Sequence, residues 1–249
     1  MTKNQAPGNG ASGIWAPLTN LTLASNALER AMERSPNLPG IVTFNGQSGL
    51  GKTMSAAYCA NKWNAVYVEC RSFYSAKSLM SAILKEAGLV AARTLNDMLE
   101  QIVAELQRSR RPLIVDEVDH IVESKALQLI RDIHDAAGCA IMLIGEEHLM
   151  RKLQRVERFH NRVLVAQPAS FASERDTRSL VAFYCRDVEI ADDAAKLIHE
   201  RSRAVVRRIC VNVDGVRSHA LARGLKKVAA ADLADFVFYT GESAIRRPV

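Results

Sequence analysis

The sequence predicts an α/β fold, in which a parallel sheet is wrapped by helices and followed by a small C-terminal all-α domain. Three observations predict it. A short β-branched and aromatic run, 41–44, leads through a glycine-rich loop into an Ala-rich helical segment. A second apolar run, 113–115, ends in two adjacent carboxylates. Beyond Pro168 helical periodicity continues without another clear buried-strand run.

Length and composition agree with this organisation. A chain of 249 residues suits one large α/β domain with a small appendage, and 48% of its residues are apolar. We expect a flexible lead-in at 1–16, the core at 17–168 and the lid at 169–249. No apolar run approaches the ~20 residues of a membrane span, and the polar start carries no export signal. We therefore expect a cytoplasmic protein that does not contact a membrane.

The glycine-rich loop is the most specific motif. Gly46–Thr53 satisfies G-x-x-x-x-G-K-[ST], and the flanking strand and helix are the context of a P-loop. Glycines let backbone N–H groups converge on phosphate, and a helix N-terminus favours negative charge. Lys52 would reach the β- and γ-phosphates of ATP, and Thr53 would ligate Mg²⁺. The expected nucleotide-binding residues are Gly46, Gln47, Ser48, Gly49, Leu50, Gly51, Lys52, Thr53 and Met54.

The carboxylates after the second apolar run predict the other half of an ATPase site. Asp116 would hold Mg²⁺ through its water shell, and Glu117 would polarise the attacking water. Two carboxylates after a strand can also mark an ordinary helix N-terminus. The P-loop upstream favours the catalytic interpretation. We expect Lys52 and Glu117 to be catalytic, and Asp119 and His120 to be solvated neighbours.

Periodicity predicts the remaining core elements, and the βα alternation of strands apolar on both faces predicts a parallel sheet. Gly138 is expected to end a helix, and Ser75 or Ser78 to begin one. Helices are expected at Leu18–Met32, 75–86, Leu95–Arg108, Lys125–Ala137 and His148–Leu153, and further strands at Ala65–Val68, Cys139–Gly145 and Val163–Val165. Lid helices are expected at Ser173–Phe183, Asp192–Arg203, Val205–Val213 and Ala231–Tyr239.

The formal charge of +6 is unevenly distributed. From Arg201 to Lys227 there are eight basic residues against one acid, Asp214. A second basic stretch runs from Arg151 to Arg162. Such clusters favour a polyanionic partner.

Together these features resemble the AAA+ ATPase family, and within it the DNA-transposition ATPases, namely the B protein of Mu-like transposable phages and its relatives TnsC and TniB. The resemblance covers roughly residues 21–235. The residues that carry it are Phe44–Thr53, Leu113–Asp119, Ile141–Leu149 and Arg158–Val163.

The resemblance implies further site residues. Such ATPases hydrolyse ATP at the seam between subunits, where an arginine of the neighbour stabilises transition-state charge. Arg162 matches that position best, and Arg158 is the second choice. The alternative is that Arg162 is a solvated arginine at the edge of the sheet with no role in hydrolysis. Arg207 resembles the sensor-2 arginine, with Arg208 expected to be exposed. Glu146 stands where the family usually has a neutral polar sensor of the γ-phosphate.

The function that the resemblance implies is an ATPase that forms a ring or helical filament on double-stranded DNA, presents this DNA to a transposase and is released by hydrolysis. Binding should be largely sequence-nonspecific, because phosphate contacts carry no base code. The expected DNA-binding residues are Arg71, Tyr74, Lys77, Arg208 and Arg223. The alternatives are an AAA+ loader or initiator acting on a replication partner and a solitary P-loop kinase.

Overall fold

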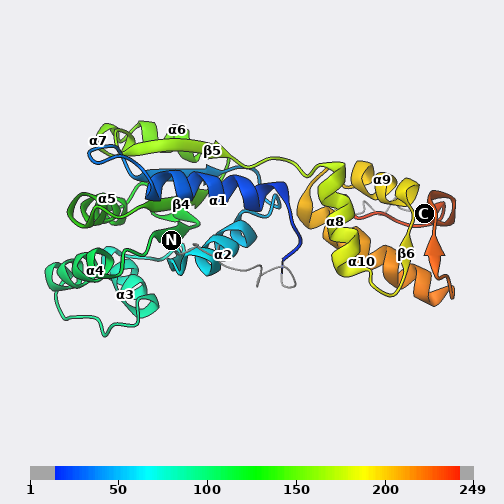
Figure 1. Ribbon diagram of the computed structural model, residues 1–249, viewed down its shortest axis with the longest axis horizontal. Coiled ribbons are helices and arrows are strands. Elements are labelled where there is room, and N and C mark those ends of the chain that lie inside the picture. The colour runs from blue at the N-terminus through cyan, green and yellow to red at the C-terminus, as the bar shows by residue number, and fades with distance from the viewer. Residues whose placement is uncertain (1–14, 242–249) are drawn as a thin grey trace, which may run out of the picture. The chain divides into compact units, whose positions relative to one another are not determined.

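The computed structural model describes residues 15–241, so residues 1–14 of the expected lead-in lie outside it. The first compact unit, 20–170, contains a five-stranded parallel sheet with the strand order β2-β3-β4-β1-β5 (Figure 1). The strands are β1 Ile41–Asn45, β2 Val66–Glu69, β3 Leu113–Asp116, β4 Ile141–Gly145 and β5 Val163–Pro168. The helical elements are α1 Thr19–Met32, α2 Lys52–Trp63, α3 Ala76–Glu86, α4 Leu95–Ser109, η1 Val118–His120, α5 Lys125–Ala137, α6 Leu149–Gln154 and α7 Glu157–His160.

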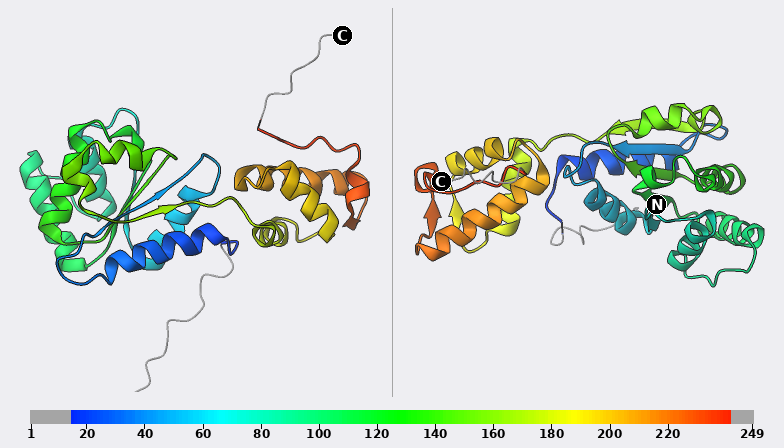
Figure 2. Two further views of the ribbon diagram at one scale, coloured as in Figure 1. Left: turned by 90° about the horizontal axis from the view of Figure 1, so that it is seen from above. Right: turned by 180° about the vertical axis from the view of Figure 1, so that it is seen from behind.

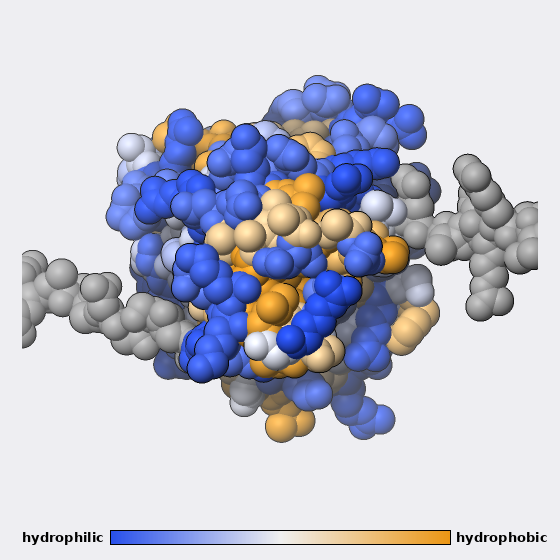
Figure 3. Space-filling view, turned by 90° about the vertical axis from the view of Figure 1, so that its right-hand side faces the viewer, coloured by the Kyte–Doolittle hydropathy of each residue, from blue (hydrophilic) through white to orange (hydrophobic). Residues whose placement is uncertain are grey.

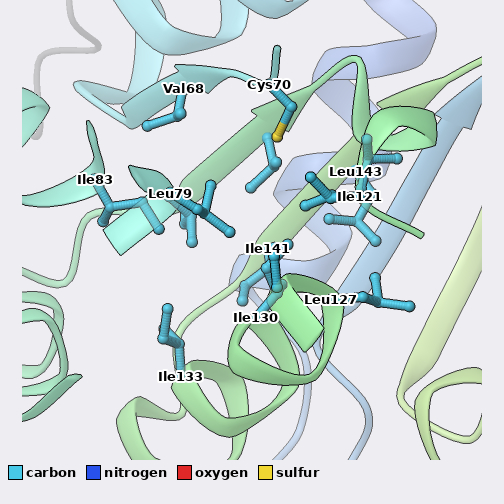
Figure 4. Packing of buried hydrophobic residues seen from close by; sticks show 14 of the residues in the cluster. Val68, Cys70, Leu79, Ile83, Ile121, Leu127, Ile130, Ile133, Ile141 and Leu143 are labelled. Carbon is cyan, nitrogen blue, oxygen red and sulfur yellow. The ribbon is translucent and has the colours of Figure 1, made fainter. Parts of the chain in front are cut away.

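Helices cover both faces of this sheet (Figure 2). Successive residues of a strand point to opposite faces. On β1, Ile41 joins a cluster with α3, α4 and α5, whereas Val42 and Phe44 join a second cluster with α1 and α2. Figure 4 shows side chains of the first cluster converging from β2, β4, α3 and α5. The predicted parallel sheet wrapped by helices is therefore confirmed.

The register places the ends of the strands at one edge of the sheet. Asn45 pairs with Gly145 and Val115 with Leu143, all in parallel ladders. The loop after β1 and Asp116 at the end of β3 consequently belong to the same edge. This geometry brings together two motifs that are more than sixty residues apart in the chain.

Local hydrogen bonds set the ends of several helices. The Ser75 hydroxyl accepts from the N–H of Ser78, so the first of the two predicted caps begins α3. Thr94 and Ser124 cap α4 and α5 in the same way. Gly138 ends α5 with a φ of 63°, a left-handed conformation that glycine adopts without steric cost.

The described part of the second compact unit comprises residues 15–19 and 171–241. Its described helices are α8 Glu174–Tyr184, α9 Asp192–Arg201 and α10 Val206–Ala222. A short parallel pair, β6 Glu189–Ile190 with β7 Lys227–Val228, accompanies them, and a 3₁₀ turn, η2 Ala230–Leu233, follows. The small strand pair was not predicted, because two-residue strands carry no recognisable periodicity.

Two predicted lid helices need correction. The helix expected to end at Val213 continues to Ala222, and its Gly215 lies against the Phe236 ring, where a Cβ would be 3.0 Å from Cζ. The helix expected at Ala231–Tyr239 is absent, and only the η2 turn forms there. The cause is non-local: the buried side chain of Asn212 bonds both the N–H and the carbonyl of Tyr239 and so draws this segment away from a helix.

Figure 3 shows apolar side chains gathered among hydrophilic ones on one face of this second unit. A hollow of about 400 Å³ in the unit is lined by Leu233, Phe236 and Phe238 among others. None of the helices in the described part of the chain is long and apolar enough to cross a membrane.

The buried side chain of Asn20 holds the glycine-rich loop of the first unit in place. Its side-chain amide donates to the carbonyls of Leu50 and Ser170, both at 2.8 Å, and its carbonyl accepts from the N–H of Ser170 at 2.8 Å. The residue is only 4% exposed. Three backbone groups therefore depend on one buried side chain for their hydrogen bonds.

We predict that Asn20→Ala lowers the free energy of unfolding by about 1–3 kcal/mol, because it leaves these buried backbone groups without partners. Asn26→Ala, on the exposed side of the same helix, is the matched control and should not lower the free energy of unfolding, since Ala is the better helix former. Urea denaturation of both variants measures the difference. Equal midpoints for the two would contradict the structural role of Asn20.

Candidate nucleotide-binding site

The loop between β1 and α2 presents backbone N–H groups at a helix N-terminus. Gly49 and Gly51 both have a φ of 85°, which side-chain-bearing residues rarely adopt. Leu50, 2% exposed, anchors the loop in the core. Gly51 supplies no side-chain cap to α2, so the first N–H groups of the helix remain available for an anion. All the predicted nucleotide-binding residues, 46–54, lie on this loop and the first turn of α2.

Lys52 lies folded over the loop. Its ammonium donates to the carbonyls of Gly46 at 2.7 Å and Gln47 at 2.9 Å. Burial lowers the pKa of Lys52, while the carboxylates of Glu117 and Asp116 partly oppose this shift. The cation is thus held inside the loop by backbone oxygens and faces the acidic ends of neighbouring elements.

Asp116 is almost completely buried, with 1% of its surface exposed. One carboxylate oxygen accepts from the N–H of Glu117 at 2.8 Å, and the other accepts from the Tyr67 hydroxyl at 3.1 Å. Burial, and next the charge of Asp116, raise the pKa of Tyr67, so the phenol stays protonated and donates. Sequence reasoning missed Tyr67, because its role depends on the pairing of β2 with β3.

Glu117 begins the η1 turn with a φ of 52°. A positive φ is uncommon for glutamate, and strained backbone of this kind gathers at functional sites. Its side chain is half-buried, and burial followed by the nearby charge of Asp116 raises its pKa. A carboxylate with a raised pKa is better suited to accept a proton from water than an ordinary surface glutamate.

Asp119 is largely buried, so the expectation that it would be a solvated neighbour is wrong. Its side chain is 8% exposed, and one oxygen pairs with the Lys152 ammonium at 2.7 Å. The other accepts from the N–H of Glu146 at 2.6 Å. Asp119 therefore ties η1 to the end of β4 and to α6. Glu146 itself is exposed, and its backbone rather than its side chain joins this network.

The residues present fit a magnesium ion that is shared with a nucleotide. Thr53 offers an exposed hydroxyl on the first turn of α2, and Asp116 offers a carboxylate. Both supply oxygen, the ligand atom that Mg²⁺ prefers, and Mg²⁺ in such sites usually keeps waters and phosphate oxygens as its other ligands. Among the described residues there is no group of three or more His, Cys, Asp or Glu that could hold a metal ion.

The predicted seam residues lie away from this loop. The Arg162 carbonyl accepts from the N–H of Ile41, at the beginning of β1, so Arg162 belongs to the edge of the sheet opposite the glycine loop. Arg158 is exposed on α7. Arg207 is exposed on α10, whereas Arg208, expected to be the exposed one, is half-buried and lies beside Gly241.

The predicted DNA-binding residues fall into two groups. The connection from β2 to α3 brings together Arg71 and Lys77, both exposed, with Tyr74, whose ring packs partly against the core. Lys77 donates to the Arg93 carbonyl at 3.0 Å. Arg208 and Arg223 lie in the second unit, where Arg223 is 3.7 Å from the Asp235 carboxylate.

Phe73, in the same connection, was not singled out from the sequence. Its side chain is 73% exposed, next to Tyr74, whose ring it meets edge to face. In the chain, Phe73 stands between the cationic residues Arg71 and Lys77. The sequence indicated only that residues 71–74 form a connection before a capped helix, and such connections usually lie at the surface.

A family profile described as an AAA domain matches residues 37–153, which include the glycine loop, the β3 carboxylates and β4. No curated protein sequence matches the chain. Solved structures share the fold. The RuvB Holliday junction branch migration motor of Thermotoga maritima matches with a TM-score of 0.60 and 21% identity over 87% of this chain. The chain spans 66% of that RuvB chain, just under two thirds of its length.

Two further structures are similar at the level of fold. Cdc6p from Pyrobaculum aerophilum has a TM-score of 0.66 and 14% identity, with 92% of this chain and 68% of that chain covered. The Aeropyrum pernix ORC1 protein, solved in complex with DNA, has a TM-score of 0.60 and 16% identity, with 87% of this chain and 63% of that chain covered. The chain thus has the AAA-type P-loop NTPase fold, and its residues 37–153 are similar to an AAA domain.

Proposed function

We propose that this protein is a Mg²⁺-dependent ATPase that assembles on double-stranded DNA and presents that DNA to a transposase. The observation that carries the ATPase part is the joining of a glycine loop, a buried Asp116 and a half-buried Glu117 at one edge of the sheet. The AAA domain match over 37–153 supports it. The DNA-binding part is supported by the exposed cations of the first unit and by the fold shared with an ORC1 protein in complex with DNA.

In this proposal each residue has one task. The N–H groups of the loop and α2 hold the phosphates, and Lys52 neutralises charge on the β- and γ-phosphates. Thr53 and Asp116 hold Mg²⁺, which supplies charge stabilisation to the transferring phosphoryl group when bound. Tyr67 keeps the Asp116 carboxylate oriented. Glu117 accepts a proton from the attacking water, in keeping with its raised pKa.

Hydrolysis in the proposal requires a second copy of the chain. Arg162 lies at the opposite edge of the sheet from the loop of its own subunit, so it serves the site of a neighbour. Arg207 acts as a sensor of the γ-phosphate. The resulting homo-oligomer is a ring or a helical filament.

The transposase is the proposed partner because the sequence resembles DNA-transposition ATPases. The second candidate is an ATPase of the loader or initiator type that acts on a replication partner. Co-purification separates the two, because the first predicts recovery of a transposase and the second predicts recovery of a replicative helicase.

We predict that Lys52→Ala weakens ATP binding at least about tenfold and abolishes ATP-dependent assembly, because a charge-assisted contact to phosphate is lost. Glu117→Gln should bind ATP normally but turn over about 100-fold more slowly. Lys62→Ala, an exposed lysine at the far end of the same helix, is the control. Isothermal titration and phosphate release measure the two effects. Wild-type turnover in Glu117→Gln would show that another group activates the water.

We predict that Arg162→Ala leaves ATP binding intact but lowers turnover about a thousandfold, as expected for an arginine that stabilises transition-state charge. A mixture of Arg162→Ala and Lys52→Ala subunits should regain activity, because some sites then combine an intact loop with an intact arginine. Turnover is measured at several mixing ratios. No regain in verified mixed oligomers would mean that Arg162 does not act across a seam.

We predict that Arg71→Ala combined with Lys77→Ala weakens ATP-dependent binding of all duplex sequences alike and leaves ATP affinity unchanged. Each lost phosphate contact lowers the slope of log affinity against log salt by about 0.9. Lys85→Ala, exposed at the far end of α3, is the control. Fluorescence anisotropy at several salt concentrations gives both quantities. An unchanged slope in the double variant would assign the DNA contact to another surface, such as that of Arg208 and Arg223.

A further inference from the structure

The Arg162 side chain is held by the Asp135 carboxylate and the Arg158 carbonyl. Its Nε donates to the two oxygens of Asp135 at 2.6 and 2.8 Å, and its Nη2 pairs with one of them. Its Nη1 donates to the Arg158 carbonyl at 2.6 Å. The carboxylate comes from α5, and the carbonyl comes from α7. The guanidinium plane is therefore fixed by two different elements.

This arrangement leaves part of the guanidinium available. Arginine has five N–H groups, and three of them are engaged by Asp135 and Arg158. One N–H on each terminal nitrogen remains without an acceptor among the described residues. The side chain is 33% exposed, so it is open to an acceptor from outside the subunit.

Asp135 is itself held in place. The N–H of Gly40 donates to His134 Nε2 at 3.1 Å, so the ring proton lies on Nδ1 and is donated to Asp135 at 3.1 Å. Burial lowers the pKa of His134, which keeps the ring neutral and this tautomer in place. A chain of hydrogen bonds thus runs from Gly40, immediately before β1, through His134 and Asp135 to Arg162.

We propose that Asp135 is a positioning residue for Arg162: it fixes the guanidinium so that its two remaining N–H groups meet the phosphate of a nucleotide bound to the neighbouring subunit. This inference rests on the proposed role of Arg162 across the seam. A flexible arginine would lose rotamer freedom when it met the phosphate. A guanidinium already fixed by Asp135 avoids that loss, in the way that a preorganised group lowers a barrier.

The test compares Asp135→Ala with Asp132→Ala. Asp132 lies one turn earlier on α5 and pairs with Arg131 at 2.6 Å, so its removal deletes a neighbouring carboxylate without touching the Arg162 contacts. We expect Asp135→Ala to lower kcat about 10- to 100-fold with the affinity for ATP unchanged. Asp135→Glu, which keeps the carboxylate, should restore part of this loss. Asp132→Ala should turn over at the wild-type rate.

Mixing of variant subunits distinguishes a positioning role of Asp135 from a merely structural one. Asp135→Ala subunits retain their own loop, so Lys52→Ala subunits, which retain a fixed Arg162, should restore turnover. A folding defect in the Asp135→Ala subunit would not be restored in this way. In the double variant Asp135→Ala with Arg162→Ala, turnover should equal that of Arg162→Ala alone. Should Asp135→Ala fail to fold, Asp135→Asn, of nearly the same shape, replaces it in every assay.

The outcomes distinguish the inference from the proposed function. A large loss in Arg162→Ala with wild-type kcat in Asp135→Ala overturns the role of Asp135 alone. No loss in Arg162→Ala overturns the seam arginine, and the positioning role with it. A further loss when Asp135→Ala is added to Arg162→Ala also overturns the inference, because Asp135 would then act through another group.

Discussion

The parallel arrangement of β1, β3 and β4 is the constraint on which the candidate site depends. In a parallel sheet all the strands end at the same edge, and the loops that follow them meet there. The ladders pair Asn45 with Gly145 and Val115 with Leu143, which brings the glycine loop, Asp116 and the end of β4 together. An antiparallel placement of any of these strands would move its following loop to the opposite edge.

Electrostatics at this edge follow from burial. Lys52 faces several carboxylates, yet the loss of hydration still lowers its pKa. Glu117 experiences the same burial together with the charge of Asp116, and both raise its pKa. Bound nucleotide and Mg²⁺ would add charges of both signs, so the site is an arrangement of partly buried charges that a ligand completes.

The opposite edge of the same sheet carries a second charged network, built from His134, Asp135 and Arg162. Gly40 joins this network to the beginning of β1, and the glycine loop follows the end of the same strand. The short strand β1, buried over residues 41–44, is therefore followed by the glycine loop, and its first residue lies beside Arg162, the proposed seam arginine. In the proposed oligomer, each subunit would offer one edge of its sheet to each of two neighbours.

Features that depend on consecutive residues could be predicted before folding was considered: the glycine loop, the Asp116–Glu117 pair after a buried run, the caps at Ser75 and Gly138, and the alternation of strands with helices. These depend on local geometry, which the chain carries wherever it folds. One prediction from local pattern was wrong: the helix expected near Tyr239 does not form, because Tyr239 makes two backbone hydrogen bonds with the side chain of Asn212.

Contacts between side chains far apart in the chain could not be predicted in this way. Tyr67 reaches Asp116, Asp119 pairs with Lys152, and Asp135 holds Arg162, although nothing near these residues in the chain indicates it. Such pairs depend on strand order and helix placement. Strand order and helix placement are determined mainly by the burial of whole apolar faces. A polar side chain contributes little to this free energy until the groups around it are in place.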